Sequence, residues 1–235
     1  MAPVWVLLAG GDLAAPSLIR RLVDEGARLL CADAGVDHAK RLGLSPHVLI
    51  GDWDSASPEA LRWAREKGAS FYTHPVAKDA SDLELAFRFL LEETPLRPKG
   101  GDGREGKGKE GPFPELHVFG ATGARLDQTV ASLFLLPLLE EKGIAVHVHA
   151  PGWLIRAVGP FRPRLTLPAR VGALLSLVPL DPVCRGVSLE GTLYPLKEAT
   201  LSRSSTLATS NEVAASPFTV ACGEGTLLLF LQEEA

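Results

Sequence analysis

The sequence predicts an α/β domain with a mostly parallel sheet over residues 1–150, followed by a small all-β sandwich over residues 151–235. In the first part, short apolar runs alternate with longer segments whose apolar residues recur at helical spacing. That alternation is typical of a parallel sheet covered by helices. After residue 150 the helical spacing stops, and short strand-like runs are separated by Gly, Pro and Ser, as in a β-sandwich.

Each strand of the first domain leads through a loop into a helix. Strands are expected at residues 4–9, 28–31, 47–50, 70–73, 116–119 and 144–149, and helices at residues 14–25, 36–42, 59–67, 83–92 and 128–142. The third helix has a clear start, with Ser57 as N-cap and Pro58 at the first helical position. Because the loops follow the carboxyl ends of the strands, they should gather at one edge of the sheet, where such sheets bind ligands.

The remaining segments follow the same reasoning. Residues 95–114 are rich in Gly, Pro, Lys and Glu without apolar periodicity, which predicts a flexible surface loop. In the second domain, strands are expected at residues 165–167, 174–178, 187–189, 192–194, 212–213, 218–221 and 226–231.

The composition argues against several classes of protein. A chain of 235 residues with 46% hydrophobic content can bury a core, and its net charge of −4 without a basic block argues against nucleic acid as a partner. No apolar stretch approaches the ~20 residues of a membrane span, and no targeting signal is recognisable. The three cysteines, Cys31, Cys184 and Cys222, are scattered. A disulfide framework is therefore not expected, and a reducing cytoplasm fits.

The motif Ile50-Gly51-Asp52-Trp53-Asp54-Ser55 follows an expected strand. Two acids so close together repel unless a cation lies between them, and Mg²⁺ is typically held by one or two carboxylates together with substrate phosphates. Asp52 and Asp54 are therefore candidate metal ligands at the carboxyl edge of the sheet. A polar turn before a helix that favours acids explains the motif equally well.

Three further motifs follow expected strands. Asp33 stands near Gly35, which would let a ligand approach the backbone, although a simple turn is the alternative. In the motif Lys78-Asp79-Ala80-Ser81-Asp82, a phosphate-binding cation accompanies two acids, but Ser81 and the following Glu84 could equally form a capping box. The motif Gly120-Ala121-Thr122-Gly123-Ala124-Arg125-Leu126-Asp127 offers backbone N–H groups and an arginine at a helix start, which suits phosphate binding.

Together, these motifs resemble the thiamin pyrophosphokinase family, whose members transfer diphosphate from ATP to thiamin. Their order and spacing match the family, and the resemblance continues through Leu175-Ser176-Leu177-Val178-Pro179-Leu180, Gly191-Thr192-Leu193-Tyr194-Pro195-Leu196 and Ser210-Asn211-Glu212. The chain departs from the family in having Gln128 where a histidine is usual and Ala34 where a glycine is common. The family implies a Rossmann-like α/β nucleotide-binding catalytic domain followed by a thiamin-binding β-sandwich.

The resemblance also implies roles for individual residues. It implies that Asp52, Asp54 and Asp79 hold Mg²⁺ against the phosphates of ATP, and that Asp33 and Asp127 complete a set of catalytic acids. It implies nucleotide contacts from Lys78, Thr122, Gly123 and Arg125, and thiamin contacts from Asp82, Ser210 and Asn211. A homodimer is expected, with the site at the subunit interface.

Two other functions remain open on the sequence. A related diphosphokinase could act on another small alcohol, such as a pterin, and would keep the nucleotide-binding half while changing the sandwich pocket. A non-catalytic regulator could bind ATP without turnover. The full set of acids favours the enzyme.

Overall fold

The structure is a computed structural model that describes residues 2–75, 79–93 and 114–233 of the chain. It divides into two compact units, Met1–Val146 and His147–Ala235. The first unit is an α/β structure and the second is all-β, which confirms the predicted fold class. The expected loop at residues 95–114 falls almost wholly outside the described residues.

A parallel sheet in the order β5-β1-β2-β3-β4 runs through the first unit. Its strands are β1 (Val4–Leu8), β2 (Arg28–Ala32), β3 (Val48–Gly51), β4 (Ser70–Thr73) and β5 (Glu115–Phe119). Almost every residue of β1, β2, β3 and β5 is buried, because helices cover both faces of the sheet.

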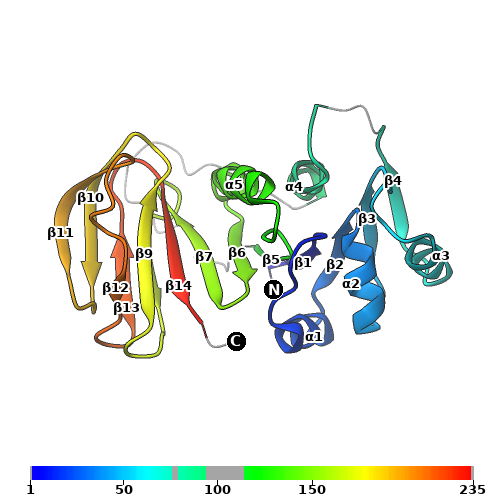
Figure 1. The fold of residues 1–235 in the computed structure, drawn as a ribbon, viewed down its shortest axis with the longest axis horizontal. Helices are drawn as coiled ribbons and strands as arrows, with labels where there is room; N and C mark the ends of the chain where they lie inside the picture. Colours follow the sequence, from blue (N-terminus) through cyan, green and yellow to red (C-terminus); the bar gives the residue numbers. More distant parts are fainter. Residues whose placement is uncertain (1, 76–78, 94–113, 234–235) are drawn as a thin grey trace. The chain divides into compact units, whose positions relative to one another are not determined.

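Helices α1 (Pro16–Asp24), α2 (Gly35–Leu42) and α3 (Pro58–Glu66) cover one face of this sheet, and α4 (Asp82–Glu93) covers the other (Figure 1). Ile19, Val36 and Ala60, one from each of the first three helices, belong to one buried cluster with side chains of β1, β2 and β3. Helix α3 begins as predicted, with Ser57 Oγ accepting a hydrogen bond from the Ala60 N–H at 3.1 Å.

The single helix expected at residues 128–142 is wrong, because the structure has two helices there. They are α5 (Leu126–Phe134) and α6 (Leu136–Glu140). Pro137 explains the break, because it has no N–H to donate to the carbonyl of residue 133 and its ring crowds that carbonyl. Helix α5 has no buried residue among its nine.

The second unit is a sandwich of two antiparallel sheets. One sheet has the order β12-β9-β14-β7-β6 and the other has the order β11-β10-β13-β8. The strands are β6 (Ala145–Ala150), β7 (Trp153–Val158), β8 (Arg164–Leu167), β9 (Leu174–Pro179), β10 (Val183–Glu190), β11 (Leu196–Ser202), β12 (Asn211–Glu212), β13 (Phe218–Ala221) and β14 (Leu227–Gln232). Leu177 and Leu229 from the first sheet share one buried cluster with Val187 and Phe218 from the second.

The expected strand at residues 192–194 is wrong. The chain there forms a turn with one isolated bridge, between Thr192 and Val213. The side chain of Asn211 bonds to both the N–H and the C=O of Tyr194, so these groups cannot join a sheet ladder. Strands β7 and β11 were not expected from the sequence, because their residues do not show a clear alternation of apolar and polar side chains.

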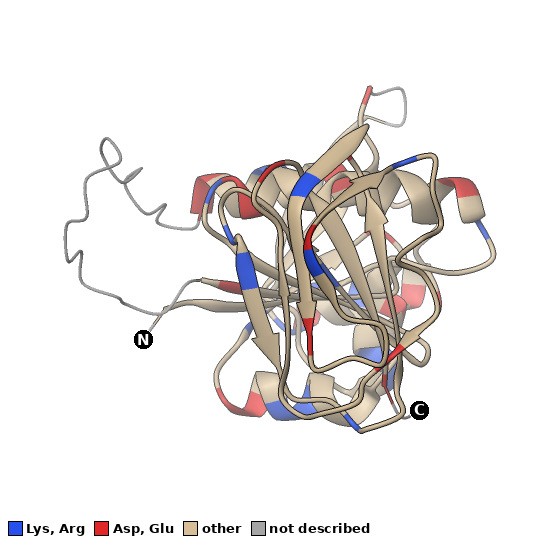
Figure 2. Ribbon diagram, turned by 90° about the vertical axis from the view of Figure 1, so that its left-hand side faces the viewer, with Lys and Arg blue, Asp and Glu red and all other residues tan. Residues whose placement is uncertain are grey.

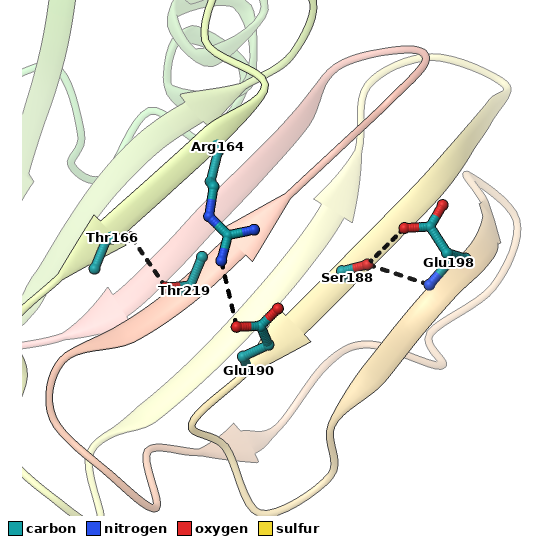
Figure 3. Close-up of polar contacts among 6 residues, drawn as sticks. All are labelled: Arg164, Thr166, Ser188, Glu190, Glu198 and Thr219. Carbon is teal, nitrogen blue, oxygen red and sulfur yellow. Dashed lines mark hydrogen bonds and ion pairs between the residues drawn. The ribbon is translucent and has the colours of Figure 1, made fainter.

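The outer face of the four-stranded sheet is polar. Basic and acidic residues are interspersed along its strands (Figure 2). Cross-strand hydrogen bonds join Arg164 to Glu190, Thr166 to Thr219, and Ser188 to Glu198 (Figure 3). The polar outer side and the buried inner side follow from the period-2 alternation of a strand with one face in water. None of the helices in the described residues has the length and apolar character of a membrane span.

Candidate active site

Three carboxylates converge at the carboxyl edge of the parallel sheet. Asp33 follows β2, Asp52 follows β3, and Asp82 is the first residue of α4. One oxygen from each lies within 4.8 Å of the other two. Three negative charges this close repel one another, and carboxylate oxygens are preferred ligands of Mg²⁺. The cluster is therefore suited to a divalent cation.

Asp33 is the most buried member of the cluster, with 9% of its surface exposed. It adopts a left-handed backbone conformation with φ of 43°, and its N–H donates to the carbonyl of Ile50 at 2.9 Å. Burial raises the pKa of Asp33, and the nearby charges of Asp82, Asp54 and Asp52 raise it further. Its Oδ1 is buried and has no hydrogen-bond partner among the described residues. A buried, unpartnered carboxylate oxygen that faces other acids fits a metal ligand.

The cluster differs from the metal set expected from the sequence, which was Asp52, Asp54 and Asp79. Asp54 is exposed and accepts a hydrogen bond from its neighbour Ser55 at 2.9 Å. Between it and Asp52, Trp53 has a positive φ of 70°, a turn that sequence spacing does not reveal. Asp79 is exposed and belongs to no three-residue cluster among the described residues. Asp82, which was expected at thiamin, joins the cluster instead.

The glycine-rich loop after β5 is bonded to the loop after β1. The Gly11 N–H donates to the Gly120 carbonyl at 2.8 Å, and the Asp12 N–H donates to the Thr122 carbonyl at 2.7 Å. A Cβ on Gly11 would lie 2.3 Å from the Thr122 oxygen, so only glycine permits this approach. Thr122 Oγ1 is buried and has no hydrogen-bond partner among the described residues. The loop thus offers a hydroxyl on a rigid support.

Arg125 and Asp127 form an exposed pair at the start of α5. Arg125 donates from Nε to Oδ1 at 2.9 Å and from Nη2 to Oδ2 at 2.6 Å. This bidentate contact lowers the pKa of Asp127 to about 2 and raises that of Arg125. Both side chains are about two-thirds exposed, so the pair adds little stability. Asp127 is spatially tied to Arg125 and is not one of the three clustered carboxylates.

Two family models match the chain. The thiamin pyrophosphokinase catalytic domain matches residues 19–148, and the thiamin pyrophosphokinase vitamin B1 binding domain matches residues 164–227. The first match alone covers more than half of the 235 residues. The chain belongs to the thiamin pyrophosphokinase family.

Individual relatives agree with this membership. The thiamine pyrophosphokinase of Bacillus subtilis is 23% identical over 223 residues, which is 95% of each chain. Its crystal structure matches 99% of this chain and 100% of that one, with a TM-score of 0.81 and 22% identity. The thiamin pyrophosphokinase of Candida albicans has a TM-score of 0.80 at 16% identity, with 99% of this chain and 90% of that one covered. At these identities, the structural likenesses establish the fold.

In the part matched by the vitamin B1 binding domain, Ser210 and Asn211 differ in exposure. Ser210 is exposed, with φ of 57°. Asn211 is 4% exposed. Its Oδ1 accepts from the N–H groups of Tyr194 at 3.0 Å and Glu212 at 2.8 Å, and its Nδ2 donates to the Tyr194 carbonyl at 2.7 Å. The amide is thus largely occupied by the backbone of a neighbouring turn. This geometry argues against the expected direct contact of Asn211 with thiamin, although Ser210 remains accessible.

Two contacts that support this candidate site were not expected from the sequence. His38 on α2 bonds to the Gly11 carbonyl at 2.9 Å, and Asp37 accepts from the Ser57 N–H at 3.0 Å. The signal available in the sequence was a polar Asp-His pair placed between apolar positions of the helix. Gln128, where the family usually has a histidine, is exposed, and Lys78 lies outside the described residues.

Proposed function

We propose that the chain transfers the diphosphate group of ATP to the hydroxyl of thiamin, giving thiamin diphosphate and AMP. The observation that carries this proposal is the cluster of Asp33, Asp52 and Asp82 at the same sheet edge as a glycine-rich loop. Membership of the thiamin pyrophosphokinase family supports the substrate assignment. The first unit would be the catalytic domain and the second the thiamin-binding domain.

Asp33, Asp52 and Asp82 would hold Mg²⁺. The buried, unpartnered Oδ1 of Asp33 and the mutual approach within 4.8 Å support this assignment. When bound, the cation would neutralise charge on the phosphates of ATP. The negative charge of Asp54 raises the pKa of Asp33. Asp54 would not bind the cation directly. Asp79, which is exposed in the loop before α4, would add a further carboxylate to the cation.

The loop from Gly120 to Arg125 would bind the phosphates. Its neighbouring chain holds it through backbone hydrogen bonds, and the Thr122 hydroxyl is buried without a partner among the described residues. Gly123 N–H faces Thr129 Oγ1 at 3.3 Å, a long contact that a phosphate oxygen could replace. Arg125 would exchange Asp127 for phosphate, because both anions accept its planar pair of donors.

The reaction needs little covalent chemistry from the protein. The thiamin hydroxyl would attack the β-phosphorus in line and AMP would leave, so that catalysis comes from positioning the two substrates and from neutralising charge. The buried amide of Asn211 would fix the Tyr194 turn, and Ser210 would contact thiamin directly. Asn211 would then act on thiamin through the turn.

A homodimer with the site at its subunit interface is supported by exposed apolar side chains on both units. On α5, Leu126, Val130 and Phe134 recur every four residues and are 73%, 54% and 53% exposed. Around the Asn211 turn, Leu193 and Tyr194 are 52% and 65% exposed. Exposed apolar side chains that lie together can mark an interaction surface, and a second copy would cover them. The buried free cysteines agree with a reducing cytoplasm.

An assay with thiamin, ATP and Mg²⁺, with products identified by mass, tests the proposal. Thiamin diphosphate and AMP in equal amounts are expected. ADP with thiamin monophosphate would refute the single diphosphate transfer. Turnover of a pterin alcohol but not of thiamin would reassign the substrate, and ATP binding without turnover of either would leave a regulator.

A further inference from the structure

One peptide unit, between Gly11 and Asp12, is held from both sides. Its carbonyl accepts a hydrogen bond from Nε2 of His38 at 2.9 Å. Its N–H donates to the Thr122 carbonyl in the glycine-rich loop at 2.7 Å. In a planar trans peptide the C=O and the N–H point in opposite directions. The hydrogen bond from His38 fixes the orientation of the carbonyl. Because the peptide is planar, it also fixes the orientation of the N–H that donates to Thr122.

The two loops pack so closely that neither backbone can shift without moving the other. A Cβ on Gly11 would lie 2.3 Å from the Thr122 oxygen and 2.6 Å from the Gly120 oxygen, and one on Gly120 would lie 2.3 Å from the Ala9 oxygen. The two backbones are thus in direct contact. A rotation of the Gly11–Asp12 peptide would be transmitted to Thr122, because close-packed groups move together.

The neighbours of His38 settle which ring nitrogen carries the hydrogen. Arg41 Nη2 lies 2.6 Å from Nδ1, and arginine can only donate, so Nδ1 accepts. The Gly11 carbonyl can only accept, so Nε2 is the nitrogen that carries the hydrogen. Burial lowers the pKa of His38, and the charge of Arg41 lowers it further. The residue is buried, with 9% of its surface exposed, and its two contacts specify one tautomer.

We infer that His38 is a positioning residue for nucleotide binding, which acts through the Gly11–Asp12 peptide on the Thr122 carbonyl and the loop that carries it. The inference rests on the proposed role of that loop in binding ATP. His38 would act on the nucleotide through the loop and would not contact it directly. It fixes the loop before ATP arrives, so that binding does not have to order it.

Two substitutions at this position separate the hydrogen bond from the bulk of the side chain. His38→Leu removes both polar contacts, whereas His38→Gln keeps an amide N–H for Gly11 and an amide oxygen for Arg41. We expect the Kd for ATP, measured by calorimetry with Mg²⁺ and without thiamin, to rise about 5- to 10-fold in His38→Leu. His38→Gln should restore most of the affinity, and the KM for thiamin should stay within about twofold of wild type in both variants.

A matched control is His47→Leu. The Nδ1 of His47 accepts a hydrogen bond from the Leu29 N–H at 3.0 Å, but His47 precedes β3 and lies at the opposite edge of the sheet from the glycine-rich loop. Its loss should lower the melting temperature without changing the Kd for ATP. Arg41→Met provides a variant at an exposed position that leaves the tautomer free to change, and should weaken ATP binding about two- to threefold.

Several results would show that His38 does not position the loop for nucleotide binding. Equal Kd values for wild type, His38→Leu and Arg41→Met would overturn the inference, as would equal weakening by His38→Leu and His47→Leu. Failure of His38→Gln to recover affinity relative to His38→Leu would show that the hydrogen bond is not responsible. If His38→Leu does not fold, the Arg41→Met result decides. Wild-type protein that does not bind ATP would refute the proposed function itself, which is a distinct result.

Discussion

Replacing Asp33 by Asn should stabilise the metal-free protein while removing its activity. Two unit charges within 4.8 Å of each other repel by at least about 3 kcal/mol at an effective dielectric constant of about 20. Asp52 and Asp82 are only partly buried, so solvent screening should reduce the gain to about 1 to 2 kcal/mol. Asparagine also tolerates the left-handed backbone that Asp33 adopts. The substitution therefore tests charge with little change in shape.

The assay is thermal unfolding in EDTA and in Mg²⁺, together with turnover. For a chain of this size, 1 kcal/mol corresponds to about 2 to 4 °C, so Asp33→Asn should melt about 2 to 8 °C above wild type in EDTA at pH 7. Mg²⁺ should raise the melting temperature of wild type, because a ligand that binds only the folded state stabilises it. It should raise that of the variant much less. Turnover should fall by at least about 10²-fold.

The pH dependence has a definite sign. The pKa of Asp33 is raised in the folded state above its ordinary value of 3.8, so the folded state binds this proton more tightly than the unfolded state does. The resulting cost is absent below pH 3.8, develops as the pH rises through the folded-state pKa, and is complete above it. The advantage of Asp33→Asn should therefore be present at pH 7 and vanish in acid.

Asp54→Asn is the matched control. Asp54 is exposed and lies outside the cluster, but its charge acts on Asp33, so the melting temperature in EDTA should rise by less than in Asp33→Asn. A variant Asp33→Asn that melts below wild type in EDTA, or that keeps the full Mg²⁺ response, would refute the assignment of Asp33 to the cation site.

Three further predictions concern the loops and the dimer. Gly11→Ala should lower kcat/KM about 10²-fold, because its Cβ would lie 2.3 Å from the Thr122 oxygen. Gly26→Ala is the control: there is open space around it, so it should lower stability but leave steady-state kinetics unchanged. Asn211→Ala should raise the KM for thiamin at a cost of about 1 to 3 kcal/mol and leave that for ATP nearly fixed; an equal rise in both would refute a thiamin-side role. At thiamin concentrations too low for Asn211→Ala to turn over, mixing Asp52→Asn with Asn211→Ala chains should restore activity through heterodimers. No rescue after confirmed subunit exchange would place the site within one chain.

Apolar periodicity was sufficient to predict those helices and strands whose structure depends on residues within the same segment. The first-unit strands and the start of α3 at Ser57 follow from short apolar runs and from local capping, and both depend on nearby residues. The break at Pro137 was available in the sequence but was underestimated, since a strong apolar pattern continued across it. The turn at Tyr194 was not predictable in this way, because a side chain distant in sequence, Asn211, occupies its backbone groups. Strand β11 was not predictable because its residues do not alternate clearly between apolar and polar.

For the site, the sequence by itself determined the type of chemistry and its place at the ends of parallel strands. The acids follow apolar runs, and the glycine-rich loop precedes a helix, so their location depends only on chain order. Which acids converge was decided by the tertiary structure. The positive φ of Trp53 turns the chain between Asp52 and Asp54, and the start of α4 brings Asp82 to Asp33. Distances between separate loops depend on how helices pack against the sheet, and local sequence patterns do not encode those distances.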